Sequence, residues 1–558
     1  MKRFIREFTV LLVLASLAAG SVIASPAKKL TEEQRIVHVL NRLGFGARPG
    51  DVQRVKAMGL ENYINQQLAP EKIDDAVAEN KVKDLGTLNM TTAELYEKYP
   101  QPGQLLRQLQ NRGLLPKDQE NPRENEESRK VVEEYYREKG LQRPQRIIAE
   151  LQASRILRAV YSERQLQEVM VDFWTNHFNV FANKGADRWL LPAYDRDTIR
   201  PHALAKFSTL LQATAQSPAM LFYLDNFQSV SPNASRPRAQ MMNAPQQQQR
   251  RGINENYARE LMELHTLGVE GGYTQKDVQE VARCFTGWTI FQPRGGAAAV
   301  NALRGEAARR VPGTFFFNAR THDDGEKIVL GHKIPAGGGF NDGMKVLDIL
   351  AHHPSTATFI ATKLVRHFVS DTPPPSLVKR VADVFTKTDG DIRETLKAIF
   401  FSNEFNSPEA YRVKVKRPFE LVISAIRTVG ADTNGGPGTH QWIARMGEPL
   451  YGFQTPNGYS DAAESWVNTG GLLERMNFGL ALAGNRVQGT RVDLTKAVKD
   501  NADKSKLVDE SLRMILAGEV SAATRETLLK QLDQQLPEGD PVSKVVGLIL
   551  GTPEFQRQ

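Results

Sequence analysis

Two glutamates one helical turn apart are the residues of this chain best placed, by type and spacing, to do chemistry. Glu260 and Glu263 belong to the stretch NENYARELMELHTLG, residues 254–268, whose apolar residues recur at helical spacing. At about 100° per residue, the two carboxylates fall on one face of that helix. Hard oxygen ligands together with one imidazole suit a divalent metal ion. The candidate metal ligands are therefore Glu260, Glu263, His177 and Asp172.

The same residues allow two other interpretations. Without a metal, two close carboxylates move each other's pKa values apart, so that one can donate a proton while the other accepts one. Glu260, Glu263 and His177 would then be catalytic residues in the hydrolysis of a cell-envelope carbohydrate. Alternatively, the carboxylates are structural and form buried hydrogen bonds or ion pairs with arginines such as Arg259. A Glu-x-x-Glu spacing is common on helices and does not decide among the three.

Two helices must position these side chains. Asn254 predicts the N-cap of the first helix, and Gly268 predicts its stop. The second helix belongs to the aromatic-rich stretch 146–181. One side of it carries a second acidic row, spaced i, i+4 and i+8, that consists of Glu168, Asp172 and Asn176.

A Gly- and Pro-rich loop at 447–461, GEPLYGFQTPNGYSD, adds aromatic side chains that could line the mouth of a pocket. In the carbohydrate interpretation, aromatic residues of this region such as Tyr451 and Trp466 serve as platforms for sugar rings. A nucleophilic triad is not expected, because the chain has no G-x-S-x-G motif. Cys284 follows apolar residues on a predicted helix and reads as a small buried hydrophobe.

Several long blocks of this sequence carry a family resemblance. They are HVLNRLGFGARPGD from residue 38, WTNHF from 174, NENYARELMELHTLGVEGGYT from 254, THDDGEKIVLG from 321, HHPSTATFIATKLVRHFV from 352 and GEPLYGFQTPNGYS from 447. The chain resembles the bacterial domain-of-unknown-function 1800 family over nearly its whole length after residue 24. That resemblance implies an exported, mostly helical protein without an established activity. It also implies an exported sulfatase-like protein as a partner.

The first 24 residues predict a secretory signal peptide. Lys2, Arg3 and Arg6 precede an apolar run that is shorter than the roughly 20 residues a bilayer requires, and a small-residue cleavage site follows. No later stretch is apolar enough to span a membrane. We therefore expect a soluble protein in the periplasm or outside the cell. With Cys284 as its one cysteine, the chain cannot form an intramolecular disulfide.

The formal net charge of +8 fits surface solubility, or some affinity for anionic polymers of the cell envelope. No nucleic-acid-binding motif is present, so nucleic acid is not an expected partner. A chain of 558 residues with 41% hydrophobic residues can bury a large core.

The expected architecture is mainly α, with helical hairpins and one small β-hairpin. The family domain, 25–490, is followed by a C-terminal helical pair, 491–558, that packs on the same body. Two stretches without periodic apolar residues, near 231–252 and 292–312, predict mobile insertions. The hairpin is expected within 314–334, between FFFNA and KIVLGHKI.

An internal echo supports this helical architecture. Residues 392–405 and 542–555 both carry an apolar helical pattern that leads into Ser/Thr-x-Glu-Phe, and each follows another predicted helix. This repetition predicts two related helical pairs. The phenylalanine of each is expected to pack back on the end of its helix.

Two classes of function follow from the residues. The first is an enzyme with a carboxylate and histidine site, with or without a divalent metal, that acts on a cell-envelope substrate. The alternative is a non-catalytic envelope protein that binds a ligand or works as a scaffold with an exported partner. The two classes differ in whether His177 approaches Glu260 and Glu263 in space.

Overall fold

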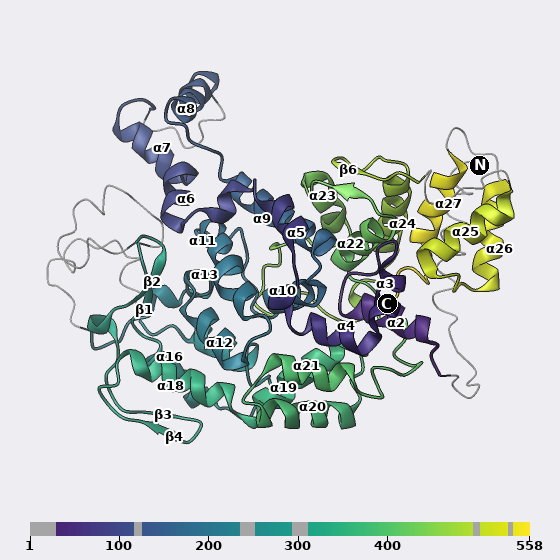
Figure 1. Ribbon diagram of the computed structural model, residues 1–558. Coiled ribbons are helices and arrows are strands. Elements are labelled where there is room, and N and C mark those ends of the chain that lie inside the picture. The colour runs from purple at the N-terminus through teal and green to yellow at the C-terminus, as the bar shows by residue number, and fades with distance from the viewer. Residues whose placement is uncertain (1–28, 117–124, 235–251, 293–310, 495–502, 534–539) are drawn as a thin grey trace.

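The computed structural model describes residues 29–116, 125–234, 252–292, 311–494, 503–533 and 540–558 (Figure 1). The predicted signal peptide and most of both predicted insertions lie outside these ranges. The described residues confirm a mainly α fold, in which small antiparallel sheets accompany many helices. No helix in them is long and apolar enough to cross a bilayer.

Local capping explains where several helices begin. The Thr31 hydroxyl accepts a hydrogen bond from the backbone N–H of Gln34, and the backbone N–H of Thr31 donates to the side-chain Oε1 of Gln34, which forms a capping box. Asn254 Oδ1 accepts from the N–H of Asn256, 2.8 Å away, and starts the predicted helix. That helix ends at Glu263, earlier than the glycine stop, and Gly268 then takes the left-handed backbone that glycine favours.

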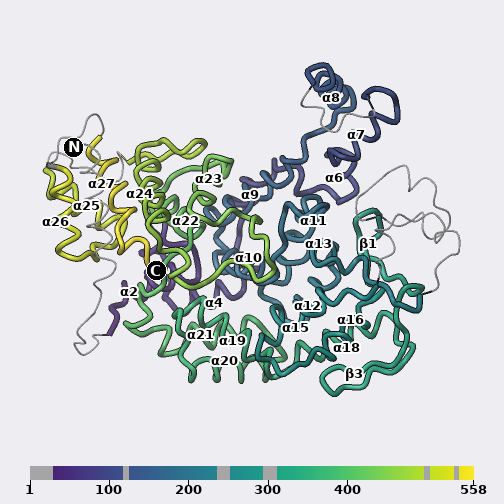
Figure 2. Tube along the Cα trace, turned by 180° about the vertical axis from the view of Figure 1, so that it is seen from behind, coloured from purple at the N-terminus to yellow at the C-terminus, as the bar shows by residue number. Residues whose placement is uncertain are grey.

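The N-terminal helices lead into a projecting arm. The first group contains α2 (Glu32–Arg42), α3 (Asp51–Met58), α4 (Leu60–Gln67) and α5 (Ala76–Val82). The arm contains α6 (Thr92–Lys98), α7 (Pro102–Asn111) and α8 (Glu126–Glu138). α7 and α8 extend away from the body in both views and have an apolar cluster of their own (Figures 1 and 2).

The next helices form the middle of the molecule. They are α9 (Gln145–Tyr161), α10 (Gln165–His177), α11 (Asp187–Ala193), α12 (Phe207–Gln216) and α13 (Pro218–Tyr223). α10, which carries the second acidic row, lies centrally in both views, and nearly all its residues are buried (Figures 1 and 2). Polar side chains on this helix must therefore find partners inside the protein.

The helical hairpin that carries the first acidic row is followed by short strands. The elements are α15 (Glu255–Glu263), α16 (Gln275–Cys284), β1 (Trp288–Phe291), β2 (Thr314–Phe317), β3 (Lys327–Val329) and β4 (His332–Ile334). β2 pairs with β1 rather than with the KIVLGHKI segment, so the expected pairing of the β-hairpin is wrong. KIVLGHKI instead folds on itself, and β3 pairs with β4.

The second half of the chain is again helical. Its elements are α18 (Phe340–Ala351), α19 (Pro354–Phe368), α20 (Pro375–Lys387), α21 (Ile392–Phe400), α22 (Pro418–Thr428), β5 (Asp432–Thr433), α23 (Pro437–Arg445), α24 (Thr469–Ala483) and β6 (Thr490–Arg491). The C-terminal helices are α25 (Lys504–Leu516), α26 (Ala522–Asp533) and α27 (Pro541–Leu550). One apolar core extends from Ile36 on α2 to Phe555 after α27, so the C-terminal helices share it.

The internal echo has the same geometry in both places. After α21, Ser402 Oγ accepts from the backbone N–H of Phe405, and after α27, Thr552 Oγ1 accepts from that of Phe555. Both phenylalanines are buried. Each also follows a packed pair of helices, α20 with α21 and α26 with α27. This confirms that the phenylalanine folds back onto the end of its helix.

Candidate functional site

The acidic pair on α15 lies at a half-buried position. Glu263 Oε2 accepts a hydrogen bond from the Tyr273 hydroxyl, 3.1 Å away. Arg259 pairs with Glu255 and Gln275, so among the described residues neither Glu260 nor Glu263 forms an ion pair. Burial, and then the neighbouring Glu263, raise the pKa of Glu260. The two carboxylates therefore repel each other without a cation between them.

His177 does not join this pair. Its Nε2 lies 3.1 Å from the backbone carbonyl oxygen of His265, and the two rings are 6.2 Å apart. A carbonyl oxygen can only accept, so Nε2 carries the proton, and Nδ1, which has no hydrogen-bond partner among the described residues, is a bare acceptor. Burial lowers the pKa of His177 well below its ordinary value, and that of His265 to about 3. His177 thus reaches the helical hairpin, but not its two glutamates.

Asp172 is held by two guanidinium groups. Arg155 Nη2 lies 2.8 Å from its Oδ1, and Arg417 donates to its Oδ2. Although burial opposes the charge, Arg417 and Arg155 lower the pKa of Asp172. Arg417 also donates to Glu448, 2.8 Å away, whose pKa burial raises to about 7. Across the described ranges, no three His, Cys, Asp or Glu side chains gather as metal ligands, so the four expected ligands do not form one site there.

The loop at 447–461 packs against the C-terminal end of α10, which leaves no open surface there for a sugar ring to bind. Asn176 accepts from the N–H of Tyr459 and donates to its carbonyl oxygen, while Asn179 donates to two further loop carbonyls. Tyr451 and Trp466 are buried. A cavity of 40 Å³ remains between this loop and Asp172, room for about one water molecule. Tyr451 and Tyr459 do line a pocket, as expected, but this cavity is too small for a sugar ring, and Trp466 is not among its lining residues.

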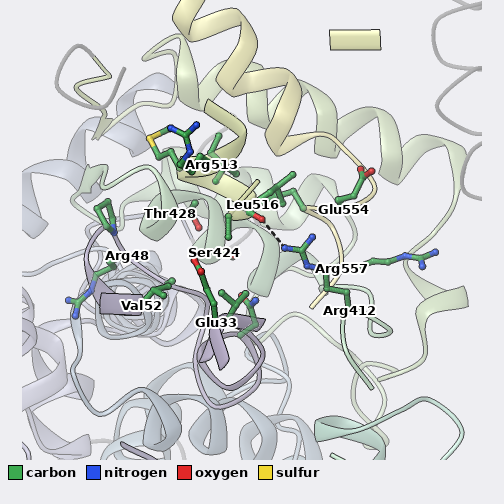
Figure 3. Close-up of a pocket in the computed structure, with 18 of the residues that line it drawn as sticks. Glu33, Arg48, Val52, Arg412, Ser424, Thr428, Arg513, Leu516, Glu554 and Arg557 are labelled. Atoms are coloured by element: carbon green, nitrogen blue, oxygen red, sulfur yellow. Dashed lines mark hydrogen bonds between the residues drawn. The ribbon is translucent and has the colours of Figure 1, made fainter. Parts of the chain in front are cut away.

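A larger pocket lies where the N-terminal helices, α22 and the C-terminal helices meet (Figure 3). Its volume is 340 Å³, and it lies within the size range of small-ligand sites. Figure 3 shows Glu33 and Val52 on one side, Ser424 and Thr428 of α22 at the middle, and Arg513 with Leu516 of α25 above. The residues come from distant parts of the chain, so no contiguous motif predicts the pocket as a whole.

Cationic side chains dominate the polar lining of this pocket. Two of them are compensated: Arg48 pairs with Asp51 and Glu163, and Arg412 pairs with Glu519. Two others, Arg513 and Arg557, are exposed and form no ion pair with a described carboxylate. The complete set of charged lining residues is Arg48, Arg412, Lys416, Arg513, Arg557, Glu33 and Glu554.

Lys416 is the buried cation of the pocket. Its Nζ lies 2.9 Å from Ser424 Oγ, 2.9 Å from the carbonyl oxygen of Phe555, and 4.0 Å from the centre of the Phe555 ring. Burial, and then Arg412, lower the pKa of Lys416 to about 7. The sequence does contain a signal for this site, because Ser424 is the one hydroxyl in the otherwise apolar stretch LVISAI.

Comparison with known proteins agrees with the blocks noted in the sequence. The model of a family described as a protein of unknown function, DUF1800, matches residues 38–557. No curated protein and no solved structure matches the chain. Because the family model covers nearly the whole chain, this protein belongs to the DUF1800 family of proteins of unknown function.

Proposed function

We propose that this protein is exported and that it binds an anionic ligand of the cell envelope in the pocket between α2–α3, α22 and α25. The observation that carries the proposal is that two guanidinium groups of the lining, those of Arg513 and Arg557, are exposed and form no ion pair with a described carboxylate. Export is inferred from the first 24 residues of the sequence. The function is therefore of the binding class, and the ligand bears carboxylate, sulfate or phosphate groups.

The chemistry of the lining favours such a ligand. A guanidinium presents a planar fork of N–H donors that matches two oxygens of an anionic group. Arg513 and Arg557 have this fork free of any described carboxylate partner. An anionic group of the ligand would give these two guanidinium groups the partner that the described residues do not provide.

The enzyme interpretation of the α15 pair stays a second candidate. Its support is that burial and Glu263 raise the pKa of Glu260, which is what a general acid requires. No contact with His177 supports a shared site, so this candidate would use the two carboxylates alone. The expected sulfatase-like partner also stays a prediction, and co-purification from the native envelope would test it.

Calorimetric titration tests the proposed function. The probes are inorganic phosphate and tetragalacturonate, an oligosaccharide with several carboxylates. We expect tetragalacturonate to bind and its affinity to fall with added salt, because part of the attraction is screened. Replacing both free arginines, Arg513→Gln with Arg557→Gln, should weaken binding at least about tenfold, equivalent to about 1.4 kcal/mol.

The control is Arg320→Gln, an exposed arginine near β2 that forms no ion pair with any described residue. It is compared with the single variant Arg513→Gln, so that each protein loses one positive charge. Arg320→Gln lowers the net charge of the protein without touching the pocket, and its affinity should stay close to that of the parent. An equal loss in the control would mean that only overall charge matters. Absence of binding by the parent protein would overturn the proposal.

A further inference from the structure

A buried amine and a buried hydroxyl meet at the floor of the anionic-ligand pocket. We propose that Ser424 is a nucleophile and Lys416 its general base, and that the site transfers a small acyl group from an ester borne by the anionic ligand. The observation is the 2.9 Å contact between Lys416 Nζ and Ser424 Oγ, with both residues lining the pocket. This inference rests on the proposed function.

The hydrogen bonds leave the serine proton available to the lysine. The carbonyl oxygen of Phe555 can only accept, so Lys416 donates one N–H to it. A neutral amine then still has its lone pair, which Ser424 Oγ–H can reach. Many helical hydroxyls here donate to the carbonyl four residues earlier, as Thr386 does, whereas Ser424 Oγ accepts a hydrogen bond from Lys416 Nζ. Once the amine is neutral, its lone pair can accept from the Ser424 hydroxyl and the direction of this bond reverses.

The surroundings favour the neutral amine that a base needs. Burial and two neighbouring cations, Arg412 and Arg475, lower the pKa of Lys416. The nearby Glu420 raises it, but by less. The resulting pKa of about 7 leaves about half of the amine unprotonated at that pH. An ordinary lysine, with a pKa near 10.5, would be almost fully protonated and could not accept the serine proton.

The reaction balances with these two residues and water. Lys416 takes the proton of Ser424 as Oγ attacks the ester carbonyl carbon, and a new C–O bond forms. When the tetrahedral intermediate collapses, the bond from carbon to the alcohol oxygen breaks, and the protonated Lys416 gives its proton to that oxygen. Water then attacks the acyl-serine with Lys416 again as base, which releases the carboxylic acid and restores Ser424. No oxidant, reductant or metal takes part.

Burial of the serine selects a small acyl group. Ser424 is 2% exposed, and the backbone of Gly46 lies so close that an added Cβ there would stand 2.9 Å from Oγ. A bulky acyl chain does not fit beside Gly46, whereas a small acyl group such as acetyl needs little room. The arginines nearer the surface would hold the charged part of the ligand. The substrate class is therefore an acetylated anionic carbohydrate or a similar short-chain ester.

A structural role for Lys416 is the competing explanation. The buried His38 makes a similar pair of contacts, with its Nε2 2.9 Å from the Phe405 carbonyl oxygen and its ring 4.6 Å from that of Phe405. In this explanation, the one role of Lys416 is to hold Phe555 in place through its carbonyl oxygen and its ring. A merely structural lysine would not make Ser424 reactive, and reactivity is what the experiment measures.

The experiment is covalent labelling of the purified full chain with a small fluorophosphonate, followed by peptide mapping. Attack of Oγ on phosphorus would form a P–O bond and expel fluoride. We expect the label on Ser424, at a rate that rises with pH around 7, the pKa of Lys416. Ser424→Ala should abolish it, and Lys416→Met should slow it at least about 100-fold. Hydrolysis of p-nitrophenyl acetate should follow the same pattern.

Ser511→Ala is the control, because Ser511 is a buried helical serine whose Oγ has no hydrogen-bond partner in the part of the chain that the structure describes. It should label like the parent. If Lys416→Met fails to fold, the pH dependence of labelling in the parent still decides the matter. Absence of label on Ser424 in the folded parent, or a rate without pH dependence, would overturn the proposal. A protein that binds tetragalacturonate but takes no label refutes the nucleophile alone, and a labelled protein that binds no anion refutes the ligand class alone.

Discussion

Lys416 Nζ donates to the carbonyl oxygen of Phe555 at 2.9 Å and lies 4.0 Å above the centre of its ring. This contact joins the start of α22 to the segment after the last helix. The backbone N–H of Lys416 also donates to the carbonyl oxygen of Gln556, 2.8 Å away. The floor of the pocket and the anchoring of the C-terminal helices therefore depend on the same residue.

The stability of the protein should rise with pH above 7 because of Lys416. Its folded-state pKa is about 7 and its ordinary value is 10.5, so between these values the unfolded chain binds more protons. Raising the pH therefore favours the folded state. In Lys416→Met this rise should be lost, as measured by urea unfolding across that range. The exposed Lys379→Met is the control, and a slope that survives in Lys416→Met would contradict the assignment.

Asp172→Asn should be among the most destabilising single changes. It leaves the buried guanidinium groups of Arg155 and Arg417 without their shared carboxylate. Breaking a buried ion pair from one side costs about 3–5 kcal/mol. The exposed pair Lys379–Asp383 provides the comparison, because Asp383→Asn should cost less than about 1 kcal/mol. Urea unfolding measures both, and a similar small loss in each would show that Asp172 is not charged in the fold.

Acid should destabilise the protein partly through His265. Burial, and then Lys363, lower its pKa to about 3 from an ordinary 6.5. As the pH falls from 6.5, the unfolded chain takes up the proton first, so folding weakens. His265→Gln should remove part of this loss in thermal melts.

His352→Gln gives the opposite sign in the same melts. Asp389 raises the pKa of His352, so the stability it contributes is present in acid and fades as the pH rises through the folded-state value. Removing His352 should therefore cost stability in acid and little at alkaline pH. Two histidine variants with the same sign of effect would contradict these assignments.

Glu260→Gln should stabilise the protein slightly at neutral pH. Burial and Glu263 raise the pKa of Glu260, so its stabilising effect is lost as the pH rises through that value. The gain should be less than about 1 kcal/mol, because solvent screens a half-buried pair. Unfolding measurements and metal analysis of the parent protein check this together. A stoichiometric metal that Glu260→Gln releases would restore the metal interpretation of the acidic row.

Features encoded within a few residues were predictable from the sequence. The caps at Thr31 and Asn254 follow from side chains that bond to a backbone group two or three positions away. The turn after each apolar helix, which buries Phe405 and Phe555, was visible as a repeated pattern. The register of the acidic pair on α15 also follows from helical periodicity.

Partners that are distant in sequence could not be predicted. β2 pairs with β1 across a long insertion, so the apparent hairpin partner was the nearer but wrong one. Asp172 is neutralised by Arg417, 245 positions away, and no spacing rule reveals such a pair. Lys416 and Ser424 are eight residues apart: Lys416 lies just before α22 and Ser424 lies on it. Phe555, which completes their site, lies near the end of the chain.

Hydrogen–deuterium exchange with and without tetragalacturonate tests the central claim, that the pocket between α2–α3, α22 and α25 is the ligand site. We predict that the ligand slows exchange in segment 412–424, which contributes Arg412, Lys416 and Ser424 to the lining, and in segment 513–517, and that it leaves 254–268 unchanged. Protection confined to 254–268, or no protection anywhere at a saturating ligand concentration, would contradict the account.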